Sequence, residues 1–309
     1  MFMKATSISE LIAIRGLDGL AWACFWPPME ALATETSDTG QIGRGIGLVT
    51  SVYALGFAIG SFAGGFITTV FGFALTFFTY FVFAALSILA VWLIAVPRHS
   101  WPSEPLLGDR LLPRLSSRDL IAGNVLGASY TFGLATIMAL LSVYAAGIEI
   151  PVYWIGIAFS IFWVGRIIGA AFSGTASDRL GRRRVVMSAL IAGSVGFVLI
   201  GIAPGFLLLA TGAFLAGLSI GGVFPVNVAI IADDVAPARR GTAMGLYETV
   251  CAIAFMAASV LGGTSANLLT PRMPYMLSAV VFVSCAAALA ILLPYRPRQS
   301  TRFERNVAD

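Results

Sequence analysis

The chain has 309 residues, of which 58% are hydrophobic and 11% are charged, and it carries a formal net charge of +4. Its mean hydropathy is +0.90. This composition excludes a water-soluble globular protein, because so few charged side chains cannot cover the surface of a folded domain. The apolar residues form long unbroken runs rather than short alternating segments, so we predict an all-α integral membrane protein and not a spanning barrel.

Nine apolar stretches follow one another along the chain. Each is about 18 residues or longer, which is enough to cross ~30 Å of hydrocarbon as a helix. In chain order they cover residues 9–33, 45–71, 73–96, 119–146, 152–173, 185–202, 205–231, 241–269 and 274–293. We therefore expect about nine transmembrane helices.

The longest polar segment, residues 97–118, separates the first three stretches from the last six. Its prolines and arginines are typical of a linker outside the membrane. We predict a partial amino-terminal half-bundle at residues 1–96, a cytoplasmic linker at 97–118, a six-helix carboxy-terminal half-bundle at 119–294 and a cytoplasmic tail at 295–309.

The first stretch contains Arg15 and Asp18, which lie three positions apart and therefore on one helical face. Such groups inside a bilayer cost about 2.5–3.5 kcal/mol each on insertion scales, so they are rarely incidental. One interpretation is an ion pair near the outer end of the span, in which each residue neutralises the other. The other interpretation, a functional one, depends on a resemblance described below.

The second stretch contains a glycine ladder, Gly56, Gly60 and Gly64, followed directly by Gly65. Glycines at four-residue spacing allow two helices to approach closely. Helix packing alone is a sufficient explanation for this pattern. We therefore assign these four glycines a packing role.

The fifth stretch contains Arg166, and the eighth contains Glu248. Glu248 lies eight residues past Arg240, about 12 Å along a helix, which is too deep for a short side chain to reach the interface easily. It is a candidate for a carboxylate that takes up and releases a proton, and the alternative is a hydrogen bond to a neighbouring helix. Arg166 has a similar depth, but its long side chain can reach the interface by snorkelling.

A short charged segment, GTASDRLGRRR at residues 174–184, connects the fifth and sixth stretches. Gly174 and Gly181 permit close packing and a tight turn, and Asp178 can cap a helix or face a helix amino end. If this segment is cytoplasmic, alternation places fifteen arginines on the cytoplasmic side and only Lys4 and Arg272 on the other. This asymmetry follows the positive-inside rule, so we expect a cytoplasmic carboxyl end and an inner (plasma) membrane location.

The two halves also match each other when the chain is shifted by 198 residues, as from Gly19 to Gly217. The same shift aligns Pro27 with Pro225, and residues 60–65 (GSFAGG) with residues 258–263 (ASVLGG). Glycine-rich helices can match by chance, but one shift that serves two helix pairs favours an internal duplication. The second copy begins near residue 119, so the first copy is expected to begin about 80 residues before Met1.

The charged segment resembles the loop motif G-x-x-x-D-R-x-G-R-R of the major facilitator superfamily, with matches at Gly174, Asp178, Arg179, Gly181, Arg182 and Arg183. Residues 11–19 are similar to the fourth-helix motif L-x-x-x-R-x-x-Q-G, with Asp18 in place of glutamine. Residues 47–65 resemble the fifth-helix antiporter motif, with Ser61 in place of proline. The resemblance covers residues 11–293 and implies that the nine helices correspond to helices 4–12 of a twelve-helix carrier.

The resemblance implies secondary transport of a small organic solute by alternating access, with proton coupling by antiport or symport as an expectation. It implies a gating role for the charged segment and a coupling role for Arg15, as the alternative to an ion pair. Asp18, Glu248 and Arg166 are the other coupling candidates. By analogy, the residues that line the pathway would be Trp22, Trp26, Asn124, Tyr130, Phe224 and Asn227, although the tryptophans also suit interfacial anchors.

Other classes of protein find no support in the sequence. There is no G-x-x-x-x-G-K-[ST] loop for ATP, no nucleophile motif, no His/Cys cluster for a metal and no basic soluble domain for nucleic acid. We therefore expect neither an enzyme nor a cofactor. The alternative to a transporter is a truncated, non-transporting membrane protein, or a misassigned start, derived from such a carrier.

Overall fold

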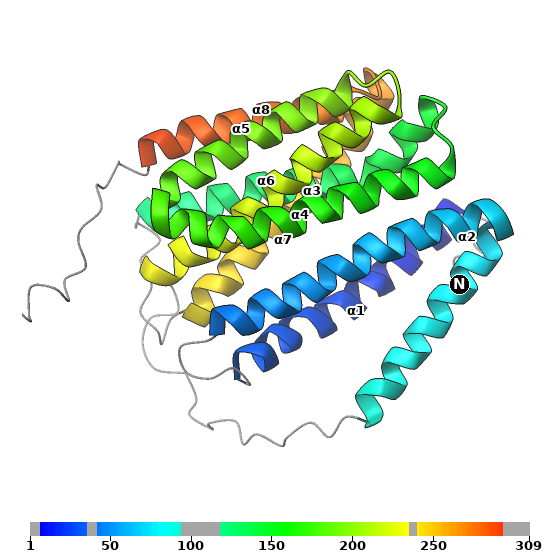
Figure 1. The fold of residues 1–309 in the computed structure, drawn as a ribbon, viewed down its shortest axis with the longest axis horizontal. Coiled ribbons are helices and arrows are strands. Elements are labelled where there is room, and N and C mark those ends of the chain that lie inside the picture. Colours follow the sequence, from blue (N-terminus) through cyan, green and yellow to red (C-terminus); the bar gives the residue numbers. More distant parts are fainter. Residues whose placement is uncertain (1–6, 36–41, 94–117, 235–239, 293–309) are drawn as a thin grey trace, which may run out of the picture. The chain divides into compact units, whose positions relative to one another are not determined.

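The computed structural model describes residues 7–35, 42–93, 118–234 and 240–292, and the statements below refer to these residues. They form eight helices and no strand, as predicted (Figure 1). The helices are α1 (Ile8–Glu35), α2 (Ile42–Leu93), α3 (Arg118–Gly147), α4 (Val152–Leu180), α5 (Arg182–Gly201), α6 (Phe206–Asp234), α7 (Arg240–Leu268) and α8 (Met273–Leu292).

Helix α2 is bent sharply at Gly72, where φ is 82° and ψ is 172° (Figure 1). Glycine adopts this conformation without the steric cost that a Cβ would add. The hydroxyl oxygens of Thr68 and Thr76 lie 2.8 Å apart across the bend and form a hydrogen bond. The bend divides α2 into two helical arms, as the sequence predicts, so the described part of the chain has nine helical segments.

Seven of the described helices, α2 to α8, are long and apolar enough to cross a membrane. The candidate span in α2 is 43 residues long and includes both of its arms. Helix α1, which carries Arg15 and Asp18, is not among the seven. The chain is therefore a multi-pass membrane protein.

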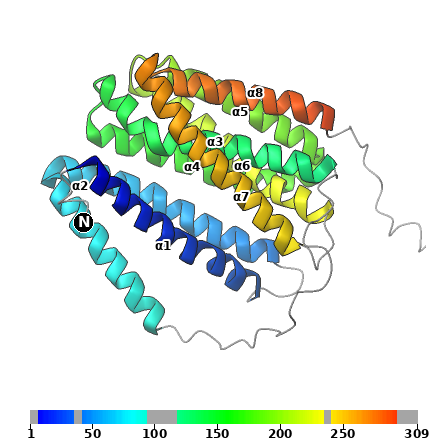
Figure 2. The same ribbon diagram turned by 180° about the vertical axis from the view of Figure 1, so that it is seen from behind.

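The chain forms two compact units. The first consists of residues 1–108 together with Val152–Ile157, and the second consists of residues 109–151 and 158–309. In the second unit, α3 contacts α6, α7 and α8, while α5 contacts α6 and α8. Figures 1 and 2 both show α5 and α8 side by side along their length.

Aromatic rings fill the centre of the second unit. The rings of Phe197 and Phe282 are fully buried, with centroids 5.1 Å apart. Glycines on the facing helices leave the room for them: a Cβ at Gly133 would lie 2.7 Å from Phe197 Cζ, and one at Gly193 would lie 2.6 Å from Phe282 Cε1. Because a methyl group at either position would overlap a ring, these glycines define the shape of the core.

Helices α4 and α6 approach each other through glycines on both sides, Gly165 and Gly169 on α4 and Gly217 and Gly221 on α6. A Cβ at Gly169 would lie 2.8 Å from the backbone nitrogen of Gly222. A Cβ at Gly221 would lie 2.7 Å from the carbonyl carbon of Arg166. Each helix thus carries a pair of glycines at four-residue spacing, the arrangement that permits close backbone packing.

The glycine ladder singled out in the sequence does not make such a contact among the described residues. No described atom lies within 4 Å of a Cβ built at Gly56, Gly60 or Gly64. Gly65 differs, since a Cβ there would lie 3.0 Å from the Cα atom of Gly156, which belongs to the same unit. A packing role for the ladder itself stays a prediction.

Candidate functional site

Two tyrosines from different helices meet inside the second unit. Tyr130 of α3 and Tyr247 of α7 are 6% and 1% exposed, and their hydroxyl oxygens lie 2.8 Å apart in a hydrogen bond. Gly127, almost one helical turn before Tyr130, makes room for the second ring. A Cβ at Gly127 would lie 3.1 Å from Tyr247 Cδ2 and 3.2 Å from the sulfur of Cys251. The sequence therefore provides both the hydroxyl pair and the space for it.

Helix α6 presents an aromatic ring and an amide to the same side of α3. The ring of Phe224 lies 6.1 Å from that of Tyr130, edge to face. Asn227, three residues further along α6, is fully buried, and neither polar atom of its side chain has a hydrogen-bond partner among the described residues. Its oxygen would lie 3.3 Å from a Cβ at Gly123 on α3. An amide in this state is costly to bury unless something pairs with it.

Asn124, another predicted lining residue, follows Gly123 on α3. Its amide nitrogen donates to the carbonyl oxygen of Leu120 at 2.8 Å, while its own oxygen is buried without a partner in the described structure. The structure thus brings Tyr130 and Phe224 together, and it turns Asn227 towards the segment of α3 that carries Asn124. The side chains of Trp22 and Trp26 lie outside the described residues, and a pathway-lining role for this set stays a prediction.

Two of the coupling candidates lie on α7 and α4: Glu248 directly follows Tyr247 on α7, and Arg166 belongs to α4. Arg166 is only 9% exposed, and its guanidinium carbon lies 4.9 Å from the centre of the Trp163 ring in a cation–π contact. The guanidinium is therefore held inside the unit and does not snorkel to its surface. Glu248 is exposed at the surface of the second unit.

The sequence analysis did not single out Tyr247 or Gly127. Tyr247 directly precedes Glu248, which the sequence analysis did single out, and this position next to a candidate residue could have drawn attention to Tyr247. Gly127 is four residues after Gly123, a spacing that indicates a close contact on that face of α3. Neither signal says which helix lies opposite, because that depends on the packing of the whole unit.

Arg15 and Asp18 of α1 form an ion pair, as the three-residue spacing predicts. Arg15 Nη1 and Asp18 Oδ2 are 3.0 Å apart, and the side chains are 73% and 50% exposed. An exposed pair of this kind contributes about 0–1 kcal/mol in water. This geometry supports mutual neutralisation, and a coupling role for Arg15 stays a prediction.

Within the charged segment, a single residue connects two helices. Helix α4 ends at Leu180 and α5 begins at Arg182, with Gly181 between them at φ 89° and ψ 142°. The backbone N–H of Gly181 donates to the carbonyl oxygen of Ser177 at 3.0 Å. The motif therefore needs its second glycine for a conformation that other residues rarely adopt.

Asp178 belongs to the last turn of α4, whereas the N-cap position of α5 is Gly181. The side chain of Asp178 and the position of Gly174 within the packing lie outside the described residues. A contact of Asp178 with a helix start or with a helix amino end, and its role as part of a gate, stay predictions.

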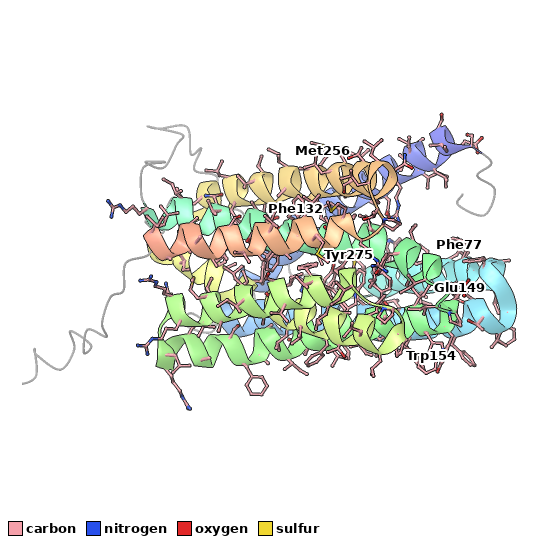
Figure 3. All side chains as sticks on the ribbon, turned by 90° about the horizontal axis from the view of Figure 1, so that it is seen from above. Phe77, Phe132, Glu149, Trp154, Met256 and Tyr275 are labelled. Atoms are coloured by element: carbon pink, nitrogen blue, oxygen red, sulfur yellow. The ribbon has the colours of Figure 1, made fainter. Side chains whose placement is uncertain are left out.

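Arg183, two residues after Gly181, has a specific partner. Arg183 donates from Nη2 to the carbonyl oxygen of Ala290, in the last turn of α8, at 3.1 Å. The last carbonyl groups of a helix lack partners within the helix, and a cation there also interacts favourably with the helix dipole. Arg179 is exposed and Arg182 is half-buried. Figure 3 shows nitrogen-tipped side chains projecting from the end of the unit where α5 begins and α8 ends.

At the other end of the second unit, a tyrosine of α3 bonds to the backbone at the end of α5. The hydroxyl group of Tyr144 donates to the carbonyl oxygens of Gly201 and Ala203, at 3.2 and 3.4 Å. Its ring lies 5.0 Å from that of Tyr275, which is fully buried and whose hydroxyl has no partner among the described residues. Figure 3 labels Tyr275 and Glu149, which lie away from the arginine-rich end.

Several characterised proteins are similar to parts of this chain. The multidrug resistance protein B homolog of Mycobacterium tuberculosis is 30% identical over 133 residues, which is 43% of this chain and 25% of that protein. The class B tetracycline resistance protein of Escherichia coli is 26% identical over 44% of this chain and 33% of its own length. The quinolone resistance protein NorA of Staphylococcus aureus is 24% identical over 55% of this chain and 43% of its own.

The chain thus spans less than half of the length of each of these relatives. Among solved structures, the peptide transporter POT in complex with sulfate superposes with a TM-score of 0.52 at 19% identity, over 68% of this chain and 44% of that one. This likeness shows the fold. The sequence profile of the Major Facilitator Superfamily matches residues 1–153 and 121–308, which together span nearly the whole chain. The chain therefore belongs to the Major Facilitator Superfamily.

Proposed function

We propose that the chain carries out, or forms part of, secondary active transport of a small organic solute by alternating access, coupled to protons. The observation that carries the proposal is a buried polar group of side chains in the membrane-spanning second unit, where Arg166 is only 9% exposed and the hydroxyls of Tyr130 and Tyr247 form a hydrogen bond. Ionisable groups at this depth are expensive and mark ion or solute pathways in membrane proteins. Membership in a transporter superfamily gives the same expectation.

The proposed solute is an aromatic or amphipathic organic molecule. Phe224 and Tyr130 offer ring faces and edges, while Asn227 and Asn124 offer buried amide atoms that have no partners among the described residues. Apolar and aromatic walls with a few polar groups are typical of sites for organic ligands. Relatives named for multidrug, tetracycline and quinolone resistance support export of such compounds as the direction of transport.

We propose an inner-membrane orientation in which the arginine-rich end of the second unit and the carboxyl end of the chain face the cytoplasm. The support is the asymmetry of fifteen arginines against two basic residues on the opposite side. The projection of arginines from the α5 end in Figure 3 is consistent with it. Trypsin treatment of sealed inside-out vesicles tests this orientation, because a cytoplasmic Arg183 region would then be accessible to the protease.

We propose that Asp178, Arg179 and Arg182 act as a cytoplasmic latch that holds one conformation of the transport cycle. The turn at Gly181 supports this role, because a one-residue connection leaves little slack between α4 and α5. Movement of either helix would therefore be passed directly to the other. The substitution Asp178→Asn would then slow conformational exchange with little effect on membrane insertion.

Transport can be measured with the full chain in liposomes under an imposed pH gradient. Tetracycline and a quinolone serve as probes, and a gradient of one pH unit, worth about 1.4 kcal/mol per proton, sustains up to about tenfold accumulation of a neutral solute. We expect gradient-driven accumulation that Glu248→Gln abolishes. The matched control is Tyr275→Phe, which removes a buried hydroxyl that forms no hydrogen bond in the described structure. Accumulation that ignores the gradient in every sample would refute proton coupling.

A further inference from the structure

The side-chain amide of Asn227 is buried without hydrogen bonds. Asn227 is fully buried, and among the described residues it alone has two buried side-chain polar atoms, Oδ1 and Nδ2, that both lack a hydrogen-bond partner. Such a group gives up its hydrogen bonds to water and gains none in exchange, which destabilises the fold. A leucine would fill a similar volume without that cost, so packing alone does not explain the amide.

Asn227 faces the part of α3 that contains Gly123 and Asn124. Its Oδ1 atom would lie 3.3 Å from a Cβ at Gly123, so the glycine leaves room for the amide. Asn124, the next residue on α3, donates from Nδ2 to the carbonyl oxygen of Leu120 at 2.8 Å. Its Oδ1 atom is buried and has no partner in the described structure. The two helices thus contribute one donor group and two acceptors whose hydrogen-bonding capacity is unused.

Aromatic rings lie on the same two helices. Phe224 precedes Asn227 by three residues on α6, and its ring lies 6.1 Å from the ring of Tyr130 on α3, edge to face. Phe224 and Asn124 are half-buried, so a solute can contact them directly. Asn227 itself must first be uncovered.

A proline in α6 provides a means of uncovering the amide. Pro225 lies inside the helix, two residues before Asn227. Proline has no N–H group, so the carbonyl oxygen of Gly221 loses its usual partner within the helix, and the helix bends more easily there. Gly221 itself is fixed against α4, because a Cβ there would lie 2.7 Å from the carbonyl carbon of Arg166. The segment of α6 that follows Pro225 is therefore the part that can move away from α3.

The chemistry of the amide indicates which group it can bind. A planar group with a donor and an acceptor side by side can form two parallel hydrogen bonds with Asn227. A carboxamide has this arrangement, since its oxygen can accept from Nδ2 while one of its N–H groups donates to Oδ1. Its second N–H group suits the unused acceptor, Oδ1 of Asn124. A carboxylate offers no donor and does not fit this pair of amides.

We propose that Asn227 and Asn124 recognise the carboxamide group of an aromatic solute, whose ring lies against Phe224 and Tyr130. The hydrogen bonds to the solute offset the cost of burying the amide of Asn227. The inference rests on the proposed function, for which it names the chemical group that selects the solute.

The test is equilibrium dialysis of the full chain in liposomes, with benzamide and acetophenone as probes and without a pH gradient. The two compounds have nearly the same shape, but acetophenone has a methyl group in place of the NH₂ group and so lacks donors. A fragment of this size is expected to bind with a Kd on the order of 1 mM. Without its two donated hydrogen bonds, acetophenone is expected to bind about tenfold more weakly than benzamide. Protein-free liposomes correct for partitioning into lipid.

Variants show whether the preference comes from the two amides. Asn227→Leu should remove the preference for benzamide, and Asn227→Ala serves the same purpose if the leucine variant does not fold. Asn124→Leu, which deletes one acceptor, should reduce the preference to about threefold. The matched control is Ser219→Ala, because Ser219 is also buried on α6 without a partner among the described residues, but it faces Gly193 on α5. This control should keep the full preference.

The proposal is overturned if benzamide and acetophenone bind the unaltered chain equally well, or if neither binds at about 10 mM. It is also overturned if the preference survives in Asn227→Leu and Asn227→Ala, or if Ser219→Ala removes it. A chain that prefers benzamide but shows no gradient-driven accumulation of tetracycline or a quinolone would refute the transport proposal alone. Gradient-driven accumulation without a preference for benzamide would refute the carboxamide proposal alone.

Discussion

Two adjacent glycines on α6 allow a matched test of the α4–α6 contact. A Cβ at Gly221 would lie 2.7 Å from the carbonyl carbon and 2.8 Å from the Cα atom of Arg166, and both are backbone atoms. A Cβ at Gly222 would find nothing nearer than the Cβ of Ala189 at 3.7 Å. Carbon atoms prefer separations of about 3.5–4.0 Å, so Gly221→Ala must push the two helices apart by roughly 1 Å, whereas Gly222→Ala fits without movement.

The sizes of the two effects follow from known substitutions. Overpacking of a tight contact costs about 1–3 kcal/mol. Replacing a glycine inside a helix by alanine stabilises the helix by up to about 1 kcal/mol through higher helix propensity. We therefore expect Gly221→Ala to destabilise the second unit by about 1–2 kcal/mol, while Gly222→Ala is neutral or slightly stabilising. The separation would also displace Arg166, because its backbone forms the contact.

Thiol reactivity during heating provides the assay. Cys251 and Cys285 are buried in the second unit, and Cys24 is exposed, so a Cys24→Ser background makes dye labelling report the opening of that unit. A difference of about 1–3 kcal/mol between the two variants corresponds to roughly 2–12 °C in the midpoint temperature. Equal midpoints for Gly221→Ala and Gly222→Ala would refute the inferred backbone contact.

Three further predictions concern single residues. Gly181→Ala should cost about 1–3 kcal/mol, because its φ of 89° is strained for a residue with a Cβ, and the thermal midpoint checks this. Arg183→Ala should lose about 0.5–1.5 kcal/mol through its bond to Ala290, and faster hydrogen exchange in the last turn of α8 would show it. Asn227→Leu should raise the thermal midpoint, since it removes a buried amide without partners in the described structure, and should abolish drug accumulation; a lowered midpoint with normal accumulation would contradict both expectations.

The helices could be predicted from the sequence because their lengths depend on the bilayer and not on one another. Each apolar run had to be long enough to cross the hydrocarbon, and its ends are marked by charges, prolines or glycines. The break at Gly72 was predicted between residues 71 and 73, and the structure has it there. The turn at Gly181 was also predicted, since a glycine between charged residues indicates a tight connection.

The contacts between helices could not be predicted in the same way. The chain has 33 glycines, and spacing alone does not say which of them face another helix. The ladder at Gly56, Gly60 and Gly64 has the favourable spacing, and yet a Cβ built at these positions would meet no described atom of another helix within 4 Å, whereas Gly217 and Gly221 make the close approach to α4. Tyr247 was missed for the same reason, because its importance depends on Tyr130, 117 positions away.

The distribution of polar groups in the second unit separates a rigid side from a responsive one. On the α4–α6 side, glycines bring backbones into contact, and no rearrangement is possible without parting the helices. On the α3–α7 side, the contact includes a hydrogen bond between two hydroxyl groups, either of which can be the donor. Arg166 belongs to the rigid side, since its backbone lies against Gly221, while its guanidinium is held over the ring of Trp163. Because the backbone of Arg166 cannot yield, any movement at this residue has to come from its side chain.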